Sequence, residues 1–352
     1  MTSDVSARSA TAPSDMTEIL YESGWSDGLP LVPPYVERVQ EFVEASGRSA
    51  EDSLGSMPPN NGDVTIEKIA TNAVMAGCLP QHMPAVVASV EASLDPRFNL
   101  RALLATTHPS ATMVMINGPA SEDLGFTGGS SAMGPGNRAN ATVGRALQLV
   151  FRNVGGSLPG VTDKATLGNP AKYSFCFAEN EAESPWAPFH VEQGFAPEDN
   201  AVTVYAAEGP HNLTNQVPRE PMSFLKGIAS LMANLGSNQI YSMGDHFVAL
   251  APEHAAVIAA ARWKKSDIQH YLFEHARLRM GDVMLGGWFG ERTERYTLWP
   301  KWVDHTDPEA SLPVCREPGD IKVVVVGGPG KHSAYLPGLG SRCITRAFVP
   351  AS

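Results

Sequence analysis

Short apolar runs alternate with stretches of helical periodicity along most of the chain. The runs ATMVMINGP (111–119), AVTVYAAEGPHN (201–212) and IKVVVVGGPGKHS (321–333) are rich in β-branched residues and reach a Gly-Pro turn. Such runs are typical of strands that are buried on both faces. Two similar runs, at 173–178 and 246–250, lack that turn.

Apolar residues three and four positions apart predict helices in the intervals between these runs. The predicted helices cover 35–45, 64–76, 85–94, 137–153, 221–235, 252–262 and 265–279. Strands that alternate with helices indicate an α/β protein with a mainly parallel or mixed sheet flanked by helices. We expect a disordered tail at 1–15, an N-terminal α/β half at 16–180, a connecting segment at 181–200 and a C-terminal α/β half at 201–352.

The charge balance argues against a nucleic-acid partner. Among 352 residues, 37 acidic side chains outnumber 26 basic ones, which gives a net charge of −11, and no basic cluster is present. No apolar run approaches the ~18 residues that span a bilayer. Four cysteines without a CxxC pair, and no secretory leader, favour reduced thiols in a cytoplasmic protein.

Polar residues follow the three Gly-Pro strands at the point where each strand ends. Ligands bind outside the carboxyl ends of strands in open α/β sheets. If the strands run parallel, one crevice collects Asn117, Glu208, His211, Asn212, Lys331, His332 and Ser333. The alternative is that each Gly-Pro turn only terminates its strand.

Two glycine-rich loops are candidate anion sites. The loop from Gly128 leads into a helix near Asn137, where free amides and the helix dipole favour an anion. It contributes Gly136, Asn137, Arg138 and Asn140, and the second loop contributes an amide nest around Gly328 and Gly330 beside Lys331. Neither loop is a Walker motif, and both could equally be structural turns.

Candidate proton-transfer and nucleophilic residues are few. His211 and Glu208 form an imidazole–carboxylate pair suited to acid–base work. Cys78 precedes a predicted helix and has His82 four residues on, an arrangement that could lower a thiol pKa. The alternatives are a hydrogen-bonded turn histidine and a buried, inert cysteine.

Metal binding has a weaker basis in the sequence. Glu179, Glu181, Glu183 and His190 lie close together, and this residue combination could bind a metal. Acid-rich stretches are usually just solvated, so we assign no metal ligands and identify no cofactor.

Several sequence segments spread over nearly the whole chain resemble those of a poorly characterised bacterial group associated with the UGSC family of selenoproteins and their cysteine homologues. These segments are GWSDGLPLVPP, NAVMAGCLPQHMPAVV, GPGNRANATVGRAL, FAENEAESPWAPFHVEQGF and GGPGKHSAYLPGLG. The UGSC signature itself, and its Cys-Gly-Ser-Cys counterpart, are absent. The resemblance implies a small-molecule enzyme or enzyme component with thiol or redox chemistry nearby, and it transfers no catalytic residue.

The leading expectation is therefore an enzyme of lyase, hydratase or hydrolase type that acts on a small anionic metabolite. In it, the Gly128 loop with Arg138 binds the anion, His211 and Glu208 move a proton, and Lys331 stabilises negative charge. One alternative is a thiol- or cofactor-bearing component of a multi-subunit oxidoreductase. Another is a non-catalytic subunit, oligomeric or partner-bound, with the apolar segments 284–290 and 296–302 as its interface.

Overall fold

The computed structural model describes residues 13–351, and its strands form two mixed four-stranded sheets. The first sheet has the order β12 (Ile344–Phe348), β5 (Asn200–Ala207), β3 (Ala111–Asn117), β4 (Cys176–Ala178). The second has the order β10 (Ile321–Val325), β7 (His246–Leu250), β11 (His332–Leu336), β6 (His211–Thr214). Two small hairpins pair β1 (Ser53–Met57) with β2 (Gly62–Thr65), and β8 (Arg277–Arg279) with β9 (Ser311–Pro313).

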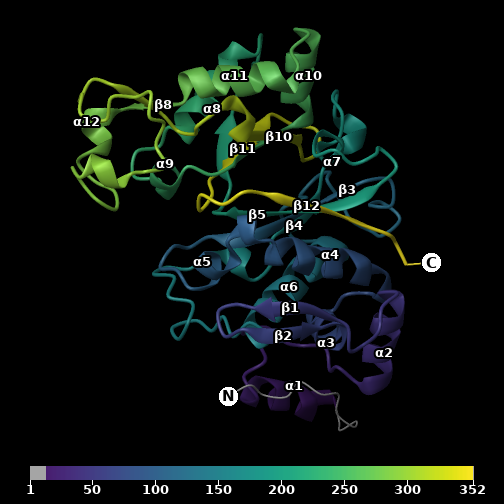
Figure 1. Cartoon of the computed structure of the whole chain (residues 1–352). Helices are drawn as coiled ribbons and strands as arrows, with labels where there is room; N and C mark the ends of the chain where they lie inside the picture. The colour runs from purple at the N-terminus through teal and green to yellow at the C-terminus, as the bar shows by residue number, and fades with distance from the viewer. Residues whose placement is uncertain (1–12, 352) are drawn as a thin grey trace.

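The two sheets pack face to face between two layers of helices (Figure 1). Residues of β3 show how this arises, since Met113 and Met115 face the second sheet whereas Val114 and Ile116 face helices. The helices on the first side are α1 (Pro13–Glu22), α2 (Val36–Ala45), α3 (Ile66–Ala76), α4 (Met83–Leu94), α5 (Leu100–Leu104) and α6 (Arg138–Asn153). The second half adds α8 (Met222–Met232), α9 (Asn238–Ser242), α10 (Pro252–Ala260), α11 (Lys265–His275) and α12 (Met280–Val283).

The α/β class with mixed sheets is confirmed, at 37% helix and 18% strand. The two sheets do not correspond to the expected halves at 16–180 and 201–352, because β5 and β12 both lie in the first sheet although they follow or begin at residue 200. Residues 181–200, which include α7 (Phe189–Glu192), do not link two separate bodies, since Phe189 is buried in the core between the sheets. Residues 1–12 of the expected tail lie outside the described residues, and α1 begins at Pro13.

The expected parallel arrangement of the Gly-Pro strands is wrong for β3 and β5. These strands are antiparallel, with Asn117 opposite Ala201 and Ala111 opposite Ala207. Asn117 and Glu208 therefore lie at opposite ends of the sheet. Continuous apolar runs report burial on both faces but carry no information on strand direction. Among residues 13–351, no helix has the length and apolar character that a membrane span requires.

Candidate functional site

The two glycine-rich loops meet where β4 and β10, the edge strands of the two sheets, end. The Gly327 amide donates to the Gly128 carbonyl over 2.7 Å. Asn180, just after β4, binds the β10 side of this junction twice, with its amide donating to the Val325 carbonyl at 2.8 Å and its side chain donating to the Gly327 carbonyl at 2.8 Å. The loops of the two halves are thus fastened to each other beside the end of β3, which carries Asn117.

The polar groups of the Gly128 loop are used within the protein. Asn137 caps α6 by accepting from the Asn140 amide at 2.8 Å, and the Asn140 side chain binds both backbone groups of Thr127. Arg138 donates to the Gly77 carbonyl at the end of α3. Gly136 lies in the left-handed region at φ +113°, in the turn before α6. This loop therefore fastens α6 to its neighbours.

The groups after β10 are likewise engaged. Lys331 Nζ donates to the Gln216 carbonyl at 3.1 Å, and His332 Nδ1 lies 3.1 Å from Asn212 Oδ1 on the neighbouring strand. The Ser333 hydroxyl binds His254 at 2.7 Å and accepts from the Ala251 amide. A β-carbon on Gly328 would meet Ser130, whereas Gly330 has open space around it at φ +152°. These contacts hold the side chains after the turn within the protein, and the predicted amide nest stays a prediction.

His211 and Glu208 lie away from this junction, at the other end of the sheets. Glu208 Oε1 is 2.9 Å from His108 Nε2, so its partner is His108 and not His211. His211 starts β6 opposite Tyr335, whose ring it meets edge-on. The expected gathering of Asn117, His211 and Lys331 around one crevice is not what the structure shows.

Cys78 lacks the surroundings of a nucleophile. Its side chain is fully buried, and burial raises the pKa of the thiol to about 12, opposite to the expected activation. His82 does not act as its base, because Nδ1 accepts from the Leu79 amide and Nε2 faces the Leu124 carbonyl. Cys176, Cys315 and Cys343 also have raised thiol pKa values, in each case chiefly through burial.

A buried polar cluster stands instead where residues 179–192 cross the flank between the sheets. Asn117 Nδ2 donates to Glu179 Oε2 at 2.6 Å and to Glu181 Oε1 at 2.8 Å. The Phe189 amide also donates to Glu179 Oε2, at 2.7 Å. Asn117 was predicted as a ligand group, and its donor nitrogen instead positions two carboxylates.

Lys265, at the start of α11, reaches this cluster from the second half of the molecule. Only 7% of its side chain is exposed, and its ammonium group lies 2.6 Å from Glu192 Oε1 and 3.8 Å from Glu179 Oε1. It also donates to the Ala187 carbonyl at 3.0 Å. One ammonium group is therefore held between two carboxylates, one deep and one near the surface.

Several buried atoms of the cluster have no hydrogen-bond partner among the described residues. They are Asn117 Oδ1, Glu179 Oε1 and both ring nitrogens of His190, of which Nδ1 lies 3.8 Å from Glu181. Glu179 Oε1 and His190 Nδ1 each have a titratable partner 3.8 Å away, whereas Asn117 Oδ1 and His190 Nε2 have no hydrogen-bond partner among the described residues. A buried polar group left unpaired costs ~1–3 kcal/mol, so two in one place are unusual for a purely structural cluster. No group of three or more His, Cys, Asp or Glu within residues 13–351 has the geometry of a metal site.

A cavity of about 530 Å³ opens beside Lys265. Three lysines, the carboxylate of Glu192, and aromatic and amide side chains line it. The complete set of lining residues is Trp186, Phe189, Glu192, Gln193, Lys264, Lys265, Ser266, Gln269, Gly319 and Lys322. Burial raises the pKa of Glu192, whose side chain is 31% exposed, and it also raises that of Glu179 behind it. We call this space the Lys265 cavity.

Only part of this site could be found from the sequence. Glu179 directly follows a predicted buried strand, a position that favours a positioned side chain over a solvated one. The acid-rich composition of 179–200 pointed the other way, toward a connecting segment. Nothing in the sequence links Glu179 to Lys265, because only the packing of the two halves brings them together.

No protein-family model, curated protein or solved structure matches this chain. The resemblance to the UGSC-associated group therefore stays a prediction.

Proposed function

We propose that the chain is an enzyme that binds a small anionic metabolite in the Lys265 cavity and moves a proton on it, as lyases and hydratases do. The observation that carries this proposal is the placement of Lys265 between Glu192 and Glu179 at the wall of a cavity. The expected class of chemistry is retained, and the residues assigned to it are different.

Charge in the Lys265 cavity favours an anionic ligand. Lys264, Lys265 and Lys322 line it against the single carboxylate of Glu192. Clefts lined by one sign of charge concentrate ligands of the opposite sign, even on a protein whose net charge is −11. The anionic group of the substrate would therefore lie toward Lys264 and Lys322.

Glu192 is the group that would transfer the proton. Its carboxylate lines the cavity, and the raised pKa brings its proton exchange closer to neutral pH, where acid–base catalysts work best. When Glu192 removes a proton from the carbon next to a carboxylate, the electron pair of the broken C–H bond moves onto the carboxylate oxygens, and the proton stays on Glu192. The Lys265 ammonium would stabilise this charge, while Glu179 holds the ammonium in place from behind.

Proton exchange in deuterated water tests the proposal without knowledge of the product. Small carboxylates and phosphate esters are incubated with the protein in D2O, and proton NMR follows loss of the carbon-bound hydrogen or appearance of a product. Wild-type protein should exchange or convert one class of probe. Glu192→Gln should slow that reaction by roughly 100-fold or more, as removal of a general acid–base does.

The matched control is Glu198→Gln, because Glu198 is an exposed glutamate in the turn that follows α7. This variant should keep the wild-type rate. Equal rates for wild type and Glu192→Gln, or no exchange, conversion or binding of any probe, would contradict the proposal.

An exposed apolar surface favours a second function, in contact with another protein. Large apolar side chains between residues 284 and 302 are exposed, and they are Leu285, Trp288, Phe289, Leu298 and Trp302. The rings of Trp288 and Phe289 meet edge-on, and exposed apolar patches with aromatic residues often mark protein contacts. Light scattering should show a complex whose mass falls when Trp288 and Trp302 are both changed to Ser; an unchanged mass would exclude self-association through this surface.

A further inference from the structure

The Lys265 cavity also has an aromatic wall, which the function proposed above does not use. Trp186 and Phe189 both line the cavity. Phe189 is 1% exposed and belongs to the core between the sheets, so little of its ring reaches the cavity. Trp186 is partly exposed, and its remaining surface packs against the core of the second half. The indole of Trp186 therefore supplies most of the aromatic surface of the cavity.

Two reciprocal hydrogen bonds hold this indole beside the lysines of the cavity. Trp186 Nε1 donates to the carbonyl of Trp263, the residue directly before Lys264, at 3.0 Å. In return, Lys265 Nζ donates to the carbonyl of Ala187, the residue directly after Trp186, at 3.0 Å. The two segments are thus fastened to each other at two points, and the indole borders the same part of the cavity as both lysines.

The three lysines of the cavity differ in how far the protein already balances their charge. Lys265 is held between its two carboxylates. Lys322 donates to the Gly319 carbonyl at 2.6 Å and lies 3.6 Å from Asp245. Lys264 is exposed, and its ammonium group has no hydrogen-bond or ion-pair partner within the described part of the chain. An anionic group that enters the cavity would therefore bind at Lys264, next to the indole.

The proposed proton acceptor lies at the same place. Glu192 Oε1 is 2.6 Å from Lys265 Nζ, and the same ammonium group binds the Ala187 carbonyl beside the indole. A carbon atom between an anionic group at Lys264 and a flat group on Trp186 would therefore lie near the Glu192 carboxylate.

A flat indole surface distinguishes ligands by their shape and electronic structure. Aromatic rings that stack gain about fivefold in affinity beyond what the buried apolar area supplies. A saturated ring buries a similar apolar area without this gain. Loss of a proton from a carbon that joins an aromatic ring to a carboxylate also makes that carbon planar, so the molecule stays flat against the indole during the proposed reaction.

We propose that the substrate is an arylacetate, which is a carboxylate whose neighbouring carbon carries an aromatic ring; this inference rests on the function proposed above. The ring stacks on Trp186, the carboxylate binds Lys264 beside the Lys265 ammonium, and the carbon between them faces Glu192. The cavity volume of about 530 Å³ suits such a molecule, since sites for small organic ligands have about 300–1,000 Å³. An aliphatic carboxylate would leave the indole without a stacking partner.

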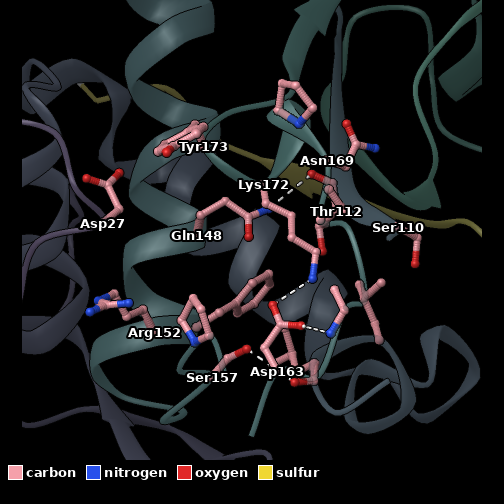
Figure 2. A pocket seen from close by; sticks show the side chains of 18 of the residues that line it. Asp27, Ser110, Thr112, Gln148, Arg152, Ser157, Asp163, Asn169, Lys172 and Tyr173 are labelled. Atoms are coloured by element: carbon pink, nitrogen blue, oxygen red, sulfur yellow. Dashed lines mark hydrogen bonds and ion pairs between the residues drawn. The ribbon is translucent and has the colours of Figure 1, made fainter. Parts of the chain in front are cut away.

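A second cavity, of about 460 Å³, is the other place where an aromatic acid could bind (Figure 2). It lies on the helical side of the first sheet, and Tyr173 and Arg152 are among the residues that line it. Its lysine, Lys172, is paired with Asp163 at 2.6 Å, as Figure 2 shows. The two cavities share no lining residue, so binding in this one would not respond to changes in the wall of the other.

Isothermal titration calorimetry with phenylacetate and cyclohexylacetate tests the inference, because these acids have the same charge and a similar size but only the first is aromatic. Wild-type protein should bind phenylacetate about fivefold more tightly. Trp186→Leu should remove this preference. Trp186→Phe should keep most of it, because phenylalanine stacks although it cannot donate to the Trp263 carbonyl. Lys264→Gln should weaken the binding of both acids by about fivefold and leave their ratio unchanged.

Trp302→Leu is the matched control, because Trp302 is an exposed tryptophan outside both cavities, and it should keep the wild-type preference. No binding of phenylacetate, equal affinity for the two acids in wild type, or a preference that survives in Trp186→Leu would overturn the inference. Unchanged affinities in both Trp186→Leu and Lys264→Gln would also overturn it and place binding elsewhere, as in the second cavity. These outcomes concern binding alone, whereas the proposed function fails when Glu192→Gln exchanges hydrogen as fast as wild type, so the two failures are distinguishable.

Discussion

Individual buried side chains in this protein differ in how completely their polar atoms are paired. His246, fully buried at the start of β7, has Nδ1 2.8 Å from the Tyr335 hydroxyl and Nε2 3.1 Å from the Val314 carbonyl. His190 is equally buried, but neither of its ring nitrogens has a hydrogen-bond partner among the described residues. A buried histidine whose two nitrogens are hydrogen-bonded stabilises one packing arrangement. A buried histidine without hydrogen bonds calls for an explanation, such as a bound water or ligand.

The burial of His246 predicts a loss of stability in acid. Burial lowers its pKa to about 4 in the folded state, below the ordinary value near 6.5 that the unfolded chain retains. Between these values the unfolded chain binds a proton that the folded chain does not, so the free energy of unfolding falls as the pH drops from 6.5 to 4. The expected loss is up to about 3 kcal/mol.

Urea denaturation at pH 7, 6, 5 and 4 measures this effect. His246→Gln should be less stable at pH 7 and should show a flatter dependence on pH across that interval. His270→Gln, at an exposed position of α11, should keep the wild-type dependence. The same slope in His246→Gln as in wild type would assign the acid sensitivity to other groups.

At the scale of elements, close backbone approach at one glycine fastens the first glycine-rich loop to the segment that carries Glu179. A β-carbon on Gly128 would lie 2.5 Å from the Ala178 carbonyl oxygen and 2.6 Å from the Asn180 amide nitrogen. Gly129, the next residue, would meet nothing closer than 3.5 Å. A comparison of substitutions at these two glycines therefore distinguishes a packing requirement from the general flexibility of the loop.

Gly128→Ala should displace residues 178–180 and cost roughly 1–3 kcal/mol of unfolding free energy, the usual range for overpacking. It should also slow any reaction that depends on Lys265, because Glu179 would shift. Gly129→Ala should stay within ~0.5 kcal/mol of wild type in chemical denaturation. Equal stability of the two variants would show that the loop yields at Gly128 without cost.

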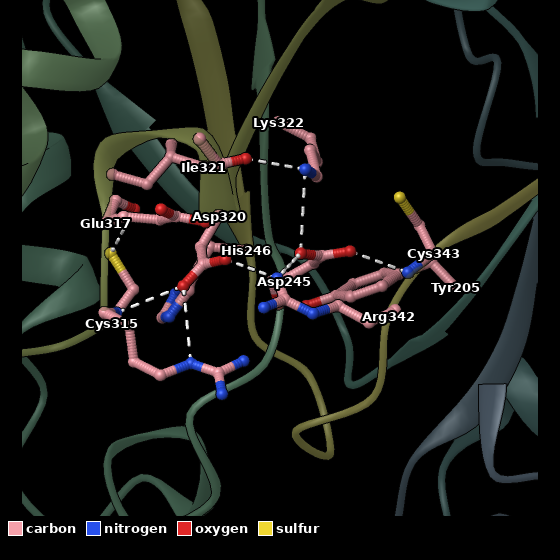
Figure 3. Close-up of polar contacts among 12 residues, drawn as sticks. Tyr205, Asp245, His246, Cys315, Glu317, Asp320, Ile321, Lys322, Arg342 and Cys343 are labelled. Atoms are coloured by element: carbon pink, nitrogen blue, oxygen red, sulfur yellow. Dashed lines mark hydrogen bonds and ion pairs between the residues drawn. The ribbon is translucent and has the colours of Figure 1, made fainter. Parts of the chain in front are cut away.

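A network of ion pairs holds the residues just before β12 in place, at the other end of the sheets (Figure 3). Arg342 contacts Asp245 at 2.7 Å and also pairs with Asp320, and Asp245 accepts from the Cys343 amide at 2.7 Å. Lys322, which lines the Lys265 cavity, lies 3.6 Å from Asp245. The network joins the starts of β7 and β10 to the strand that returns to the first sheet.

Loss of Arg342 would leave two buried carboxylates with weaker pairing. Arg342→Met should cost about 3 kcal/mol, the lower end of the effect of breaking buried pairs, because the guanidinium is partly exposed. Arg279→Met removes an exposed arginine with two acidic partners, and it should cost less than ~1 kcal/mol. Adding Asp320→Asn to Arg342→Met should restore part of the stability, because it removes one buried, weakly paired charge. Thermal or urea unfolding measures this effect, and no recovery would argue against that cause.

The positions of helices and strands could be predicted from the sequence much better than the direction of the strands and the sheet to which each belongs. The run at 246–250 is β7 without change, and the helix expected at 137–153 is α6 from Arg138 to Asn153. The run at 201–212 is in fact two strands, β5 and β6, that belong to different sheets and are divided at Gly209 and Pro210. Hydrophobic periodicity records which residues are buried, but strand direction and sheet membership depend on contacts between distant segments.

The whole molecule is held together by apolar packing between the two sheets. The core there draws on both sheets, with Met113 and Tyr205 from the first and Phe247 and Val324 from the second. The helix layers have their own cores on the outer faces of the same sheets. Since each sheet belongs to two cores, neither half retains its packing when the other unfolds, and the Lys265 site exists only in the assembled pair.

This arrangement predicts a single cooperative unfolding transition whose stability depends on the core between the sheets. Phe247 is fully buried there, with its ring 4.8 Å from that of Tyr205 and 5.5 Å from that of Phe189. Phe247→Ala should cost about 3–5 kcal/mol. Circular dichroism and tryptophan fluorescence should still report coincident denaturation curves, because the strands that lose contact serve both halves. Two separated transitions, in wild type or in this variant, would instead show that each sheet with its helices is stable alone, and the proposed site would then be formed by the docking of two domains.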